Sequence, residues 1–254
     1  MVFSVNEIYF EHSISIVIPL HNKSETILLT LNKIKKDLKN LNYEIIIVEN
    51  GSTDDSFILA DQWCKLNPDL NITLTTSSVG LGYALKKGFS LAQNSYIWVV
   101  PADMQLGVSD LTSFISNFDI NTSLYIGSRH HEDSVVTRHW SRKPISAVFN
   151  KLKKILIQSN ISDTMGSIIA EKKNLKELYL LPKTNKFFYL TELTSYYEVN
   201  KLKVIEIPVE TYLEIDMVKQ NKSTVNFLKT PIEIIFNLFV LRKNLKDYKS
   251  RNQL

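Results

Sequence analysis

A carboxylate and a side-chain amide follow one of the apolar runs of the sequence, in the segment Pro101-Ala102-Asp103-Met104-Gln105. The preceding residues 96–100 are typical of a buried strand, and an acidic residue at the carboxyl end of a strand is well placed to hold a cation against phosphate groups. Mg²⁺ and Mn²⁺ prefer oxygen ligands and usually take one or two carboxylates together with phosphate oxygens. Asp103 and Gln105 are therefore candidate metal ligands, and capping of a loop is the alternative role for Asp103.

Two glycines open a predicted helix over residues 82–91. The chain contains only 7 glycines in 254 residues, so Gly80 and Gly82 indicate a tight turn that presents helix N-terminal amides. Such amides suit a diphosphate. Gly88 comes one turn too late for a dinucleotide-binding fingerprint. Helix capping by glycine is the alternative.

Basic residues gather between Arg129 and Lys154, with few acids among them. Arg142, Ser146 and Asn150 are four residues apart, so a helix would place them on one face. Guanidinium groups beside a hydroxyl match a phosphate monoester, which accepts paired hydrogen bonds from arginine. A basic helix is otherwise a solvated face or a weak nucleic-acid patch, but no aromatic stacking run accompanies this one. We therefore expect phosphate rather than nucleic acid as the partner.

Strands and helices alternate in the first half of the chain. This order predicts a parallel sheet with right-handed crossovers and ligands at the carboxyl ends of the strands. The predicted strands are residues 13–18, 44–48, 72–75 and 96–100, and the helices between them are residues 27–41, 55–66 and 82–91.

Two polar turns are predicted to lie side by side at that carboxyl edge. Pro19 ends the first strand and is followed by Asn22 and Glu25, while Glu49 and Asn50 follow the second strand. A nucleobase and ribose would meet backbone groups and a few side-chain acceptors there. A solvated turn is the alternative, because Asn, Gly, Ser and Asp also serve turn chemistry.

The second half is less regular. We expect mobile loops at residues 183–186 and 214–222. The pattern of residues 225–245 places an apolar stripe between basic ends, which fits a core helix or a helix in the lipid interface. The predicted elements are strands over residues 124–126 and 203–207 and helices over residues 187–199 and 225–245.

Composition predicts a soluble globular chain, with 44% hydrophobic and 22% charged residues. No run approaches the roughly 18 to 20 apolar residues of a spanning helix. The N-terminus lacks the pattern of a signal peptide, so we expect a cytoplasmic protein. The single Cys64 excludes an internal disulfide and a cysteine-rich metal site. The net charge of +4 is too small for a dedicated nucleic-acid binder.

The ordered set of motifs resembles family 2 glycosyltransferases of the GT-A fold, and within them the polyprenyl-phosphate (dolichol-phosphate) sugar synthases. The resemblance covers roughly residues 13 to 225. It implies an α/β, Rossmann-like, mostly parallel sheet flanked by helices, in one domain over residues 1–224 with a nucleotide-binding half at about 13–105 and an acceptor half at about 106–224. The apolar and basic pattern at the end of the chain separately predicts a C-terminal amphipathic basic helix at 225–254. The motifs are IVIPLHNKSETI, VENGSTDDS, VGLGYALKKGF, PADMQ, GSR, the Arg142/Ser146/Asn150 spacing, DTMG and EIPV.

The resemblance implies transfer of a sugar from a nucleotide diphosphate donor to a polyprenyl phosphate, with inversion and with Mg²⁺ or Mn²⁺. It also implies contact with the cytoplasmic face of a membrane. Asp103, Arg129 and Arg142 would be catalytic. The remaining roles are metal binding by Asp103 and Gln105, acceptor-phosphate binding by Arg129, Arg142, Ser146 and Asn150, and nucleotide binding by Pro19, Asn22, Glu25, Glu49, Asn50, Gly80 and Gly82.

The sequence departs from the family pattern at three places. Glu49 and Asn50 stand where two aspartates usually contact the base, and Pro101 replaces the first aspartate of Asp-Ala-Asp-x-Gln. No Glu-Asp pair stands at the usual position of a general base, which favours a phosphate acceptor because a phosphate is already an anion. Two alternatives remain: transfer to a saccharide hydroxyl in surface polysaccharide synthesis, and a degenerate, non-catalytic nucleotide-sugar-binding protein, suggested by Pro101.

Overall fold

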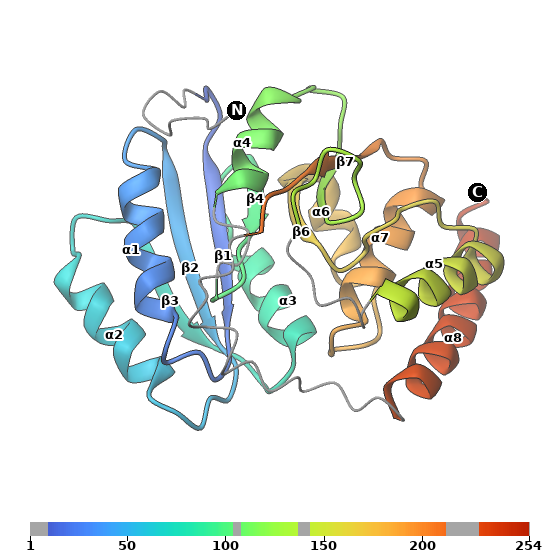
Figure 1. The fold of residues 1–254 in the computed structure, drawn as a ribbon, viewed down its shortest axis with the longest axis horizontal. Coiled ribbons are helices and arrows are strands. Elements are labelled where there is room, and N and C mark those ends of the chain that lie inside the picture. The colour runs from blue at the N-terminus through green and yellow to red at the C-terminus, as the bar shows by residue number, and fades with distance from the viewer. Residues whose placement is uncertain (1–9, 104–107, 137–142, 212–228, 254) are drawn as a thin grey trace.

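The computed structural model describes residues 10–103, 108–136, 143–211 and 229–253. Within them the chain forms one sheet with helices on both faces (Figure 1). The strands are β1 (Ile14–Leu20), β2 (Tyr43–Glu49), β3 (Ile72–Thr76), β4 (Tyr96–Val99), β5 (Leu124–Ser128), β6 (Ser167–Glu171) and β7 (Val204–Pro208). The helices are α1 (Ile27–Asp37), α2 (Ser56–Leu66), α3 (Leu81–Leu91), α4 (Ser109–Ser116), α5 (Lys143–Ile157), α6 (Lys172–Leu178), α7 (Tyr189–Val199) and α8 (Lys229–Asn252).

The strand order is β3-β2-β1-β4-β6-β5-β7. β6 is antiparallel to both of its neighbours, and the other paired strands are parallel. All strands except β6 therefore end at the same edge of the sheet, which confirms the mostly parallel sheet. The chain moves outward from β1 to β3 and then returns to place β4 on the other side of β1. This reversal of strand order is where parallel sheets open a crevice for ligands.

The two faces of the sheet are covered by separate hydrophobic clusters. Alternate residues of β1 enter different clusters, Ile16 and Ile18 on one face and Val17 on the other. Helices α1, α2 and α4 pack on the face of Ile16, whereas α3, α6, α7 and α8 pack on the face of Val17. Burial on both faces explains why β1, β2 and β4 are almost continuously apolar.

Several boundaries differ from the sequence expectation. Pro19 does not end β1, because the ladder with β2 continues through Leu20. Gly127 likewise lies inside β5. The sequence did not predict α4, β6 or α6.

The two loops expected to be mobile have different outcomes. The backbone carbonyl of Asn185 accepts a hydrogen bond from Gly82 N, 2.9 Å away, so the segment 183–186 is fastened to the start of α3. The expected loop 214–222 lies outside the described residues.

The C-terminal helix is present as α8. Leu238, Leu241 and Leu245 are buried in the cluster that also contains Val17. Among the described residues, no helix combines the length and the apolar character that a membrane crossing requires.

Candidate active site

The turns after β1 and β2 are fastened to each other at the carboxyl edge of the sheet. Asn22 adopts a positive φ of 49°, and its Oδ1 accepts a hydrogen bond from Thr53 N at 2.8 Å. Asn22 N donates to Ser52 Oγ at 3.1 Å, and His21 Nδ1 lies 3.0 Å from the Asn50 carbonyl oxygen. The two turns that the sequence assigned to a nucleoside therefore form one unit, with Asn22 and Asn50 in it.

The acidic and amide side chains of the second turn are buried. Glu49 accepts a hydrogen bond from the backbone of Ser52, so its carboxylate shapes the turn that follows it. Asn50 Oδ1 accepts a hydrogen bond from Gly80 N at 3.4 Å, which ties this turn to the start of α3. Glu25 is exposed on the first turn.

Both glycines at the start of α3 are explained by close packing. Gly80 has a φ of 136°, and a Cβ on it would collide with the Asn185 carbonyl oxygen. A Cβ on Gly82 would come within 2.7 Å of Asn185 Cα. Since Gly82 N already donates to Asn185, the protein itself satisfies one of the amides that the sequence assigned to a diphosphate. Diphosphate binding at this helix stays a prediction.

Asp103 follows β4 at the same edge. The hydroxyls of Thr26 and Thr30 donate to the Ala102 carbonyl oxygen at 3.0 and 2.9 Å, which fixes the chain as it leaves the strand. Asp103 Oδ2 lies 2.7 Å from Lys23 Nζ, in the turn after β1. Gln105 lies outside the described residues, and the described residues contain no group of three or more His, Cys, Asp or Glu side chains that could hold a metal. Metal binding by Asp103 stays a prediction, and a site with this one described carboxylate would need phosphate oxygens as further ligands.

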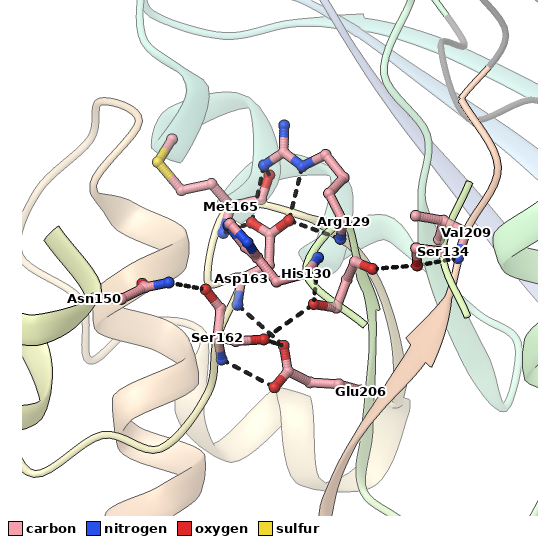
Figure 2. A network of polar contacts seen from close by, with 10 residues as sticks. Arg129, His130, Ser134, Asn150, Ser162, Asp163, Met165, Glu206 and Val209 are labelled. Carbon is pink, nitrogen blue, oxygen red and sulfur yellow. Dashed lines mark hydrogen bonds and ion pairs between the residues drawn. The ribbon is translucent and has the colours of Figure 1, made fainter. Parts of the chain in front are cut away.

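Arg129 follows β5 and is clamped by Asp163 (Figure 2). Its Nε donates to Asp163 Oδ2 at 2.7 Å and its Nη2 to Asp163 Oδ1 at 2.9 Å, and Nη2 also reaches the Met165 carbonyl oxygen at 3.2 Å. Burial acts to raise the pKa of Asp163, but the hydrogen bonds and charge of Arg129 outweigh it and lower that pKa. In Figure 2, the third guanidinium nitrogen points away from the carboxylate.

A second layer of hydrogen bonds holds Asp163 in place. Glu206, on β7, accepts hydrogen bonds from the backbone of Ser162 at 2.9 Å and of Asp163 at 3.0 Å. Its carboxylate also accepts the Ser162 hydroxyl at 2.6 Å. Asn150 Nδ2 donates to the Ser162 carbonyl oxygen at 2.7 Å, so α5 joins the same network (Figure 2).

The structure does not describe the side chains of the other two residues predicted to bind an acceptor phosphate. Arg142 and the side chain of Ser146 lie outside the described residues. The structure therefore brings Arg129 and Asn150 to one network without showing the full predicted face.

Sequence reasoning missed Lys23, Asp163 and Glu206 as site residues. Asp163 and Glu206 stand in the segments DTMG and EIPV, so their motifs were visible but their partners were not. Lys23 was visible only as a cation in the first polar turn.

Comparisons with known proteins show the family and the fold of this chain. A model described as Glycosyl transferase family 2 matches residues 15–178. Polyprenol monophosphomannose synthase of Mycolicibacterium smegmatis is 24% identical over 218 residues, which cover 83% of this chain and 82% of that protein. Dolichyl-phosphate beta-glucosyltransferase of Dictyostelium discoideum is 25% identical over 246 residues, which cover 88% of this chain and 74% of that protein.

A solved enzyme shares the fold. A crystal structure of glucosyl-3-phosphoglycerate synthase from Mycobacterium tuberculosis with uridine-diphosphate gives a TM-score of 0.64 at 13% identity, covering 93% of this chain and 81% of that one. A second structure of that synthase contains Mn²⁺, uridine-diphosphate and glucosyl-3-phosphoglycerate, with a TM-score of 0.59 at 15% identity, covering 82% of this chain and 75% of that one. These likenesses show the fold that the sequence motifs implied. Because the family model spans more than half of the sequence and the sheet has the matching fold, the chain belongs to glycosyltransferase family 2 and is a nucleotide-sugar-dependent glycosyltransferase of the GT-A fold.

Proposed function

We propose that this transferase moves a sugar from a nucleoside diphosphate to a polyprenyl phosphate, with inversion at the anomeric carbon. The observation that carries the proposal is the similarity to a polyprenol monophosphomannose synthase along most of both chains. The clamped Arg129 supports it, because a guanidinium held in a fixed orientation can bind an oxygen anion such as a phosphate. Glu49 and Asn50 stand where the family usually has two aspartates that contact the base, so a different pair of side chains would contact the base here.

The donor binds at the carboxyl edge of β1, β2 and β4. The fastened turns, with Pro19, Asn22, Glu25, Glu49 and Asn50, hold the nucleoside. Asp103, with Gln105, binds a divalent cation together with the donor phosphates. When bound there, a divalent cation would supply Lewis-acid stabilisation of the charge that develops on the leaving diphosphate.

The acceptor phosphate binds at Arg129. The Asp163 carboxylate accepts hydrogen bonds from Nε and Nη2 of Arg129, so Nη1 of Arg129 remains to bind an oxygen anion. Solvent reaches this group, because 32% of the Arg129 side chain is exposed. Because Asp163 already fixes the guanidinium plane, little conformational freedom is lost when the phosphate binds. Arg142, Ser146 and Asn150 are proposed to complete this phosphate site.

The reaction needs no proton acceptor from the protein. An acceptor phosphate oxygen attacks the anomeric carbon, and the bond from that carbon to the donor phosphate oxygen breaks. Glu192 lies in the segment Thr191-Glu192-Leu193 and is buried, where it accepts backbone hydrogen bonds from Lys183 and Thr184. The carboxylate of Glu192 thus fixes the segment 183–186, which contacts the start of α3 through Asn185. These contacts fit a structural role for Glu192 rather than that of a general base.

The test is product formation from a short polyprenyl phosphate, compared with the unphosphorylated alcohol and an oligosaccharide, across a panel of nucleotide sugars. Arg142→Lys keeps the charge but loses the paired hydrogen bonds, and should lower kcat/KM on the phosphate by roughly 10- to 100-fold. The matched control is Arg251→Lys, which makes the same change at an exposed position near the C-terminus. Transfer to the oligosaccharide alone would favour polysaccharide synthesis, and no transfer with retained nucleotide binding would favour a non-catalytic protein.

A lipid acceptor also requires contact with a membrane, and α8 offers a surface for it. Ile235, Phe236, Phe239 and Val240 lie on one helical face opposite the buried leucines, with exposed fractions of 38, 66, 54 and 38%. Exposed basic residues follow on the same helix: Arg242, Lys243, Lys246 and Lys249. An apolar stripe beside basic side chains matches the interface of an anionic bilayer.

Flotation with phosphatidylglycerol vesicles tests this contact. The double variant Phe236→Ser/Phe239→Ser should lose most of the vesicle-bound fraction. Leu66→Ser is the control, because Leu66 is 80% exposed at the end of α2, away from α8. Equal flotation of the wild type and the double variant would contradict a role for α8 in membrane contact.

A further inference from the structure

The side chain of Lys23 crosses from the turn after β1 to the carboxylate after β4. Its Nζ lies 2.7 Å from Asp103 Oδ2, and the two side chains are 34% and 17% exposed. The backbone amide of Lys23 donates to Ser56 Oγ at 2.7 Å, which fixes the start of the side chain. An ammonium group therefore contacts the carboxylate that the proposed function gives to a metal.

This ion pair changes what Asp103 can bind before the donor arrives. A divalent cation must displace the ammonium, and Pro101 supplies no second carboxylate to compensate. Ion pairs that solvent reaches are weak, and this one has a single contact between the two side chains. Lys23 can therefore leave Asp103 when a stronger anion becomes available.

A donor diphosphate is such an anion. The lysine ammonium has three donors on a flexible four-carbon stem, so it can turn from Asp103 to a phosphate oxygen without movement of the backbone. Once the ammonium has moved, the Asp103 carboxylate would be able to hold a divalent cation beside the bound phosphates.

We propose that Lys23 binds the carboxylate of Asp103 in the donor-free enzyme and binds the donor diphosphate when the donor arrives. Asp103 then becomes available to the divalent cation. This inference rests on the proposed donor site. It makes metal and nucleotide binding cooperative, and the coupling must be the same in both directions.

The experiment measures two equilibria that need no turnover. Mn²⁺ binding is followed by electron paramagnetic resonance, and binding of UDP, GDP, CDP and dTDP by calorimetry, in Mn²⁺ and in chelator. The wild type should bind Mn²⁺ at least about tenfold more tightly with a bound nucleotide than without one.

Lys23→Met removes the ammonium and keeps the length of the side chain. It should raise the affinity for Mn²⁺ without nucleotide by about threefold or more, because the ammonium no longer competes with Mn²⁺ for Asp103. It should lower the affinity for the nucleotide in chelator by about tenfold, because a charge-assisted contact to phosphate is lost. Lys36→Met is the matched control on the exposed face of α1 and should change neither affinity.

Lys23→Arg is the control that separates loss of the charge from a general loss of structure. It keeps the positive charge and should retain most of the nucleotide affinity in chelator. If Lys23→Met leaves both affinities unchanged, Lys23 is only a surface ion pair and the inference is wrong. If none of the four nucleotides binds the wild type in Mn²⁺ or in chelator, the proposed donor site fails and the inference fails with it. Nucleotide binding by the wild type only in Mn²⁺ would retain the donor site but refute Lys23 as a phosphate ligand.

Discussion

Asp110 is a buried acid whose ionisation should make the stability of this enzyme depend on pH. It lies in the first turn of α4 and is 2% exposed. Its Oδ2 accepts a hydrogen bond from Trp98 Nε1 at 2.7 Å, and its Oδ1 accepts one from Leu111 N at 2.9 Å. Burial raises the pKa of Asp110 from 3.8 to about 6, and the hydrogen bonds oppose that shift without cancelling it.

The sign of the effect follows from the raised pKa. The folded protein holds the proton of Asp110 more tightly than the unfolded chain does, so this group favours folding in acid. Its contribution is complete below the unfolded pKa of 3.8 and is lost as the pH rises through the folded pKa of about 6. The difference between these two pKa values corresponds to about 3 kcal/mol of stability, and about 2 kcal/mol of that is lost between pH 4.5 and 7.5.

Asp110→Asn removes the ionisation and keeps the shape of the side chain. The amide has one carbonyl oxygen for two donors, so the variant carries a constant loss from one hydrogen bond. Superimposed on that loss, the free energy of unfolding of the variant relative to the wild type should rise by about 2 kcal/mol from pH 4.5 to 7.5.

Urea unfolding followed by tryptophan fluorescence measures this difference at each pH. Asp69→Asn, at an exposed position, is the control for the exchange of a carboxylate for an amide. A flat difference for Asp110→Asn would refute the reasoning, because it would mean that Asp110 binds its proton equally in the folded and unfolded states.

Three further predictions concern the contacts around the site. Asp163→Asn should destabilise the fold by about 2–3 kcal/mol, because it leaves the guanidinium of Arg129 partly buried without its counter-ion; an unchanged urea midpoint would contradict this role. Gly82→Ala should cost about 1–3 kcal/mol, since the new methyl group would press on the backbone of Asn185. A thermal midpoint equal to that of the wild type would show that the segment around Asn185 can move to accommodate the methyl group without loss of stability. Glu192→Gln should retain most of the turnover, because the amide oxygen can still accept the backbone hydrogen bonds; loss of activity in a folded variant would indicate a general base.

The parallel half of the fold could be predicted because its strands are buried on both faces and are separated by polar turns. The second half lacks such signals. β6 passes directly into α6 at Glu171 and Lys172, with no glycine, proline or polar turn between them. Its central apolar run is Ile168-Ile169-Ala170, too short to separate a strand from a helix by periodicity. α4 spans only eight residues, which gives little more than two turns of pattern.

The positions of the candidate residues could be predicted better than their partners. Parallel strands bring their carboxyl ends together, so the turn after β1 and the residue Asp103 were expected at one edge. The sequence could not show that Lys23, 80 residues away, contacts Asp103. It also grouped Lys153 with the basic stretch, whereas Lys153 is 1% exposed, donates to the Ile161 carbonyl oxygen and has a pKa lowered by burial. Contacts between residues far apart in sequence depend on tertiary packing, which local patterns do not encode.

The structure holds a cation against an acid at both proposed phosphate sites, but the two pairs differ in a way that suits their roles. Arg129 and Asp163 share two side-chain hydrogen bonds, and Glu206 holds the backbone around Asp163, so that pair can remain intact while a phosphate binds. Lys23 and Asp103 share one contact in a more open setting, so the ammonium can exchange one anion for another. A fixed guanidinium orients an attacking phosphate without reorganisation of the site. An exchangeable ammonium instead would make Asp103, the proposed metal ligand, available only when the donor is bound, and the proposed reactive complex would then assemble in a fixed order.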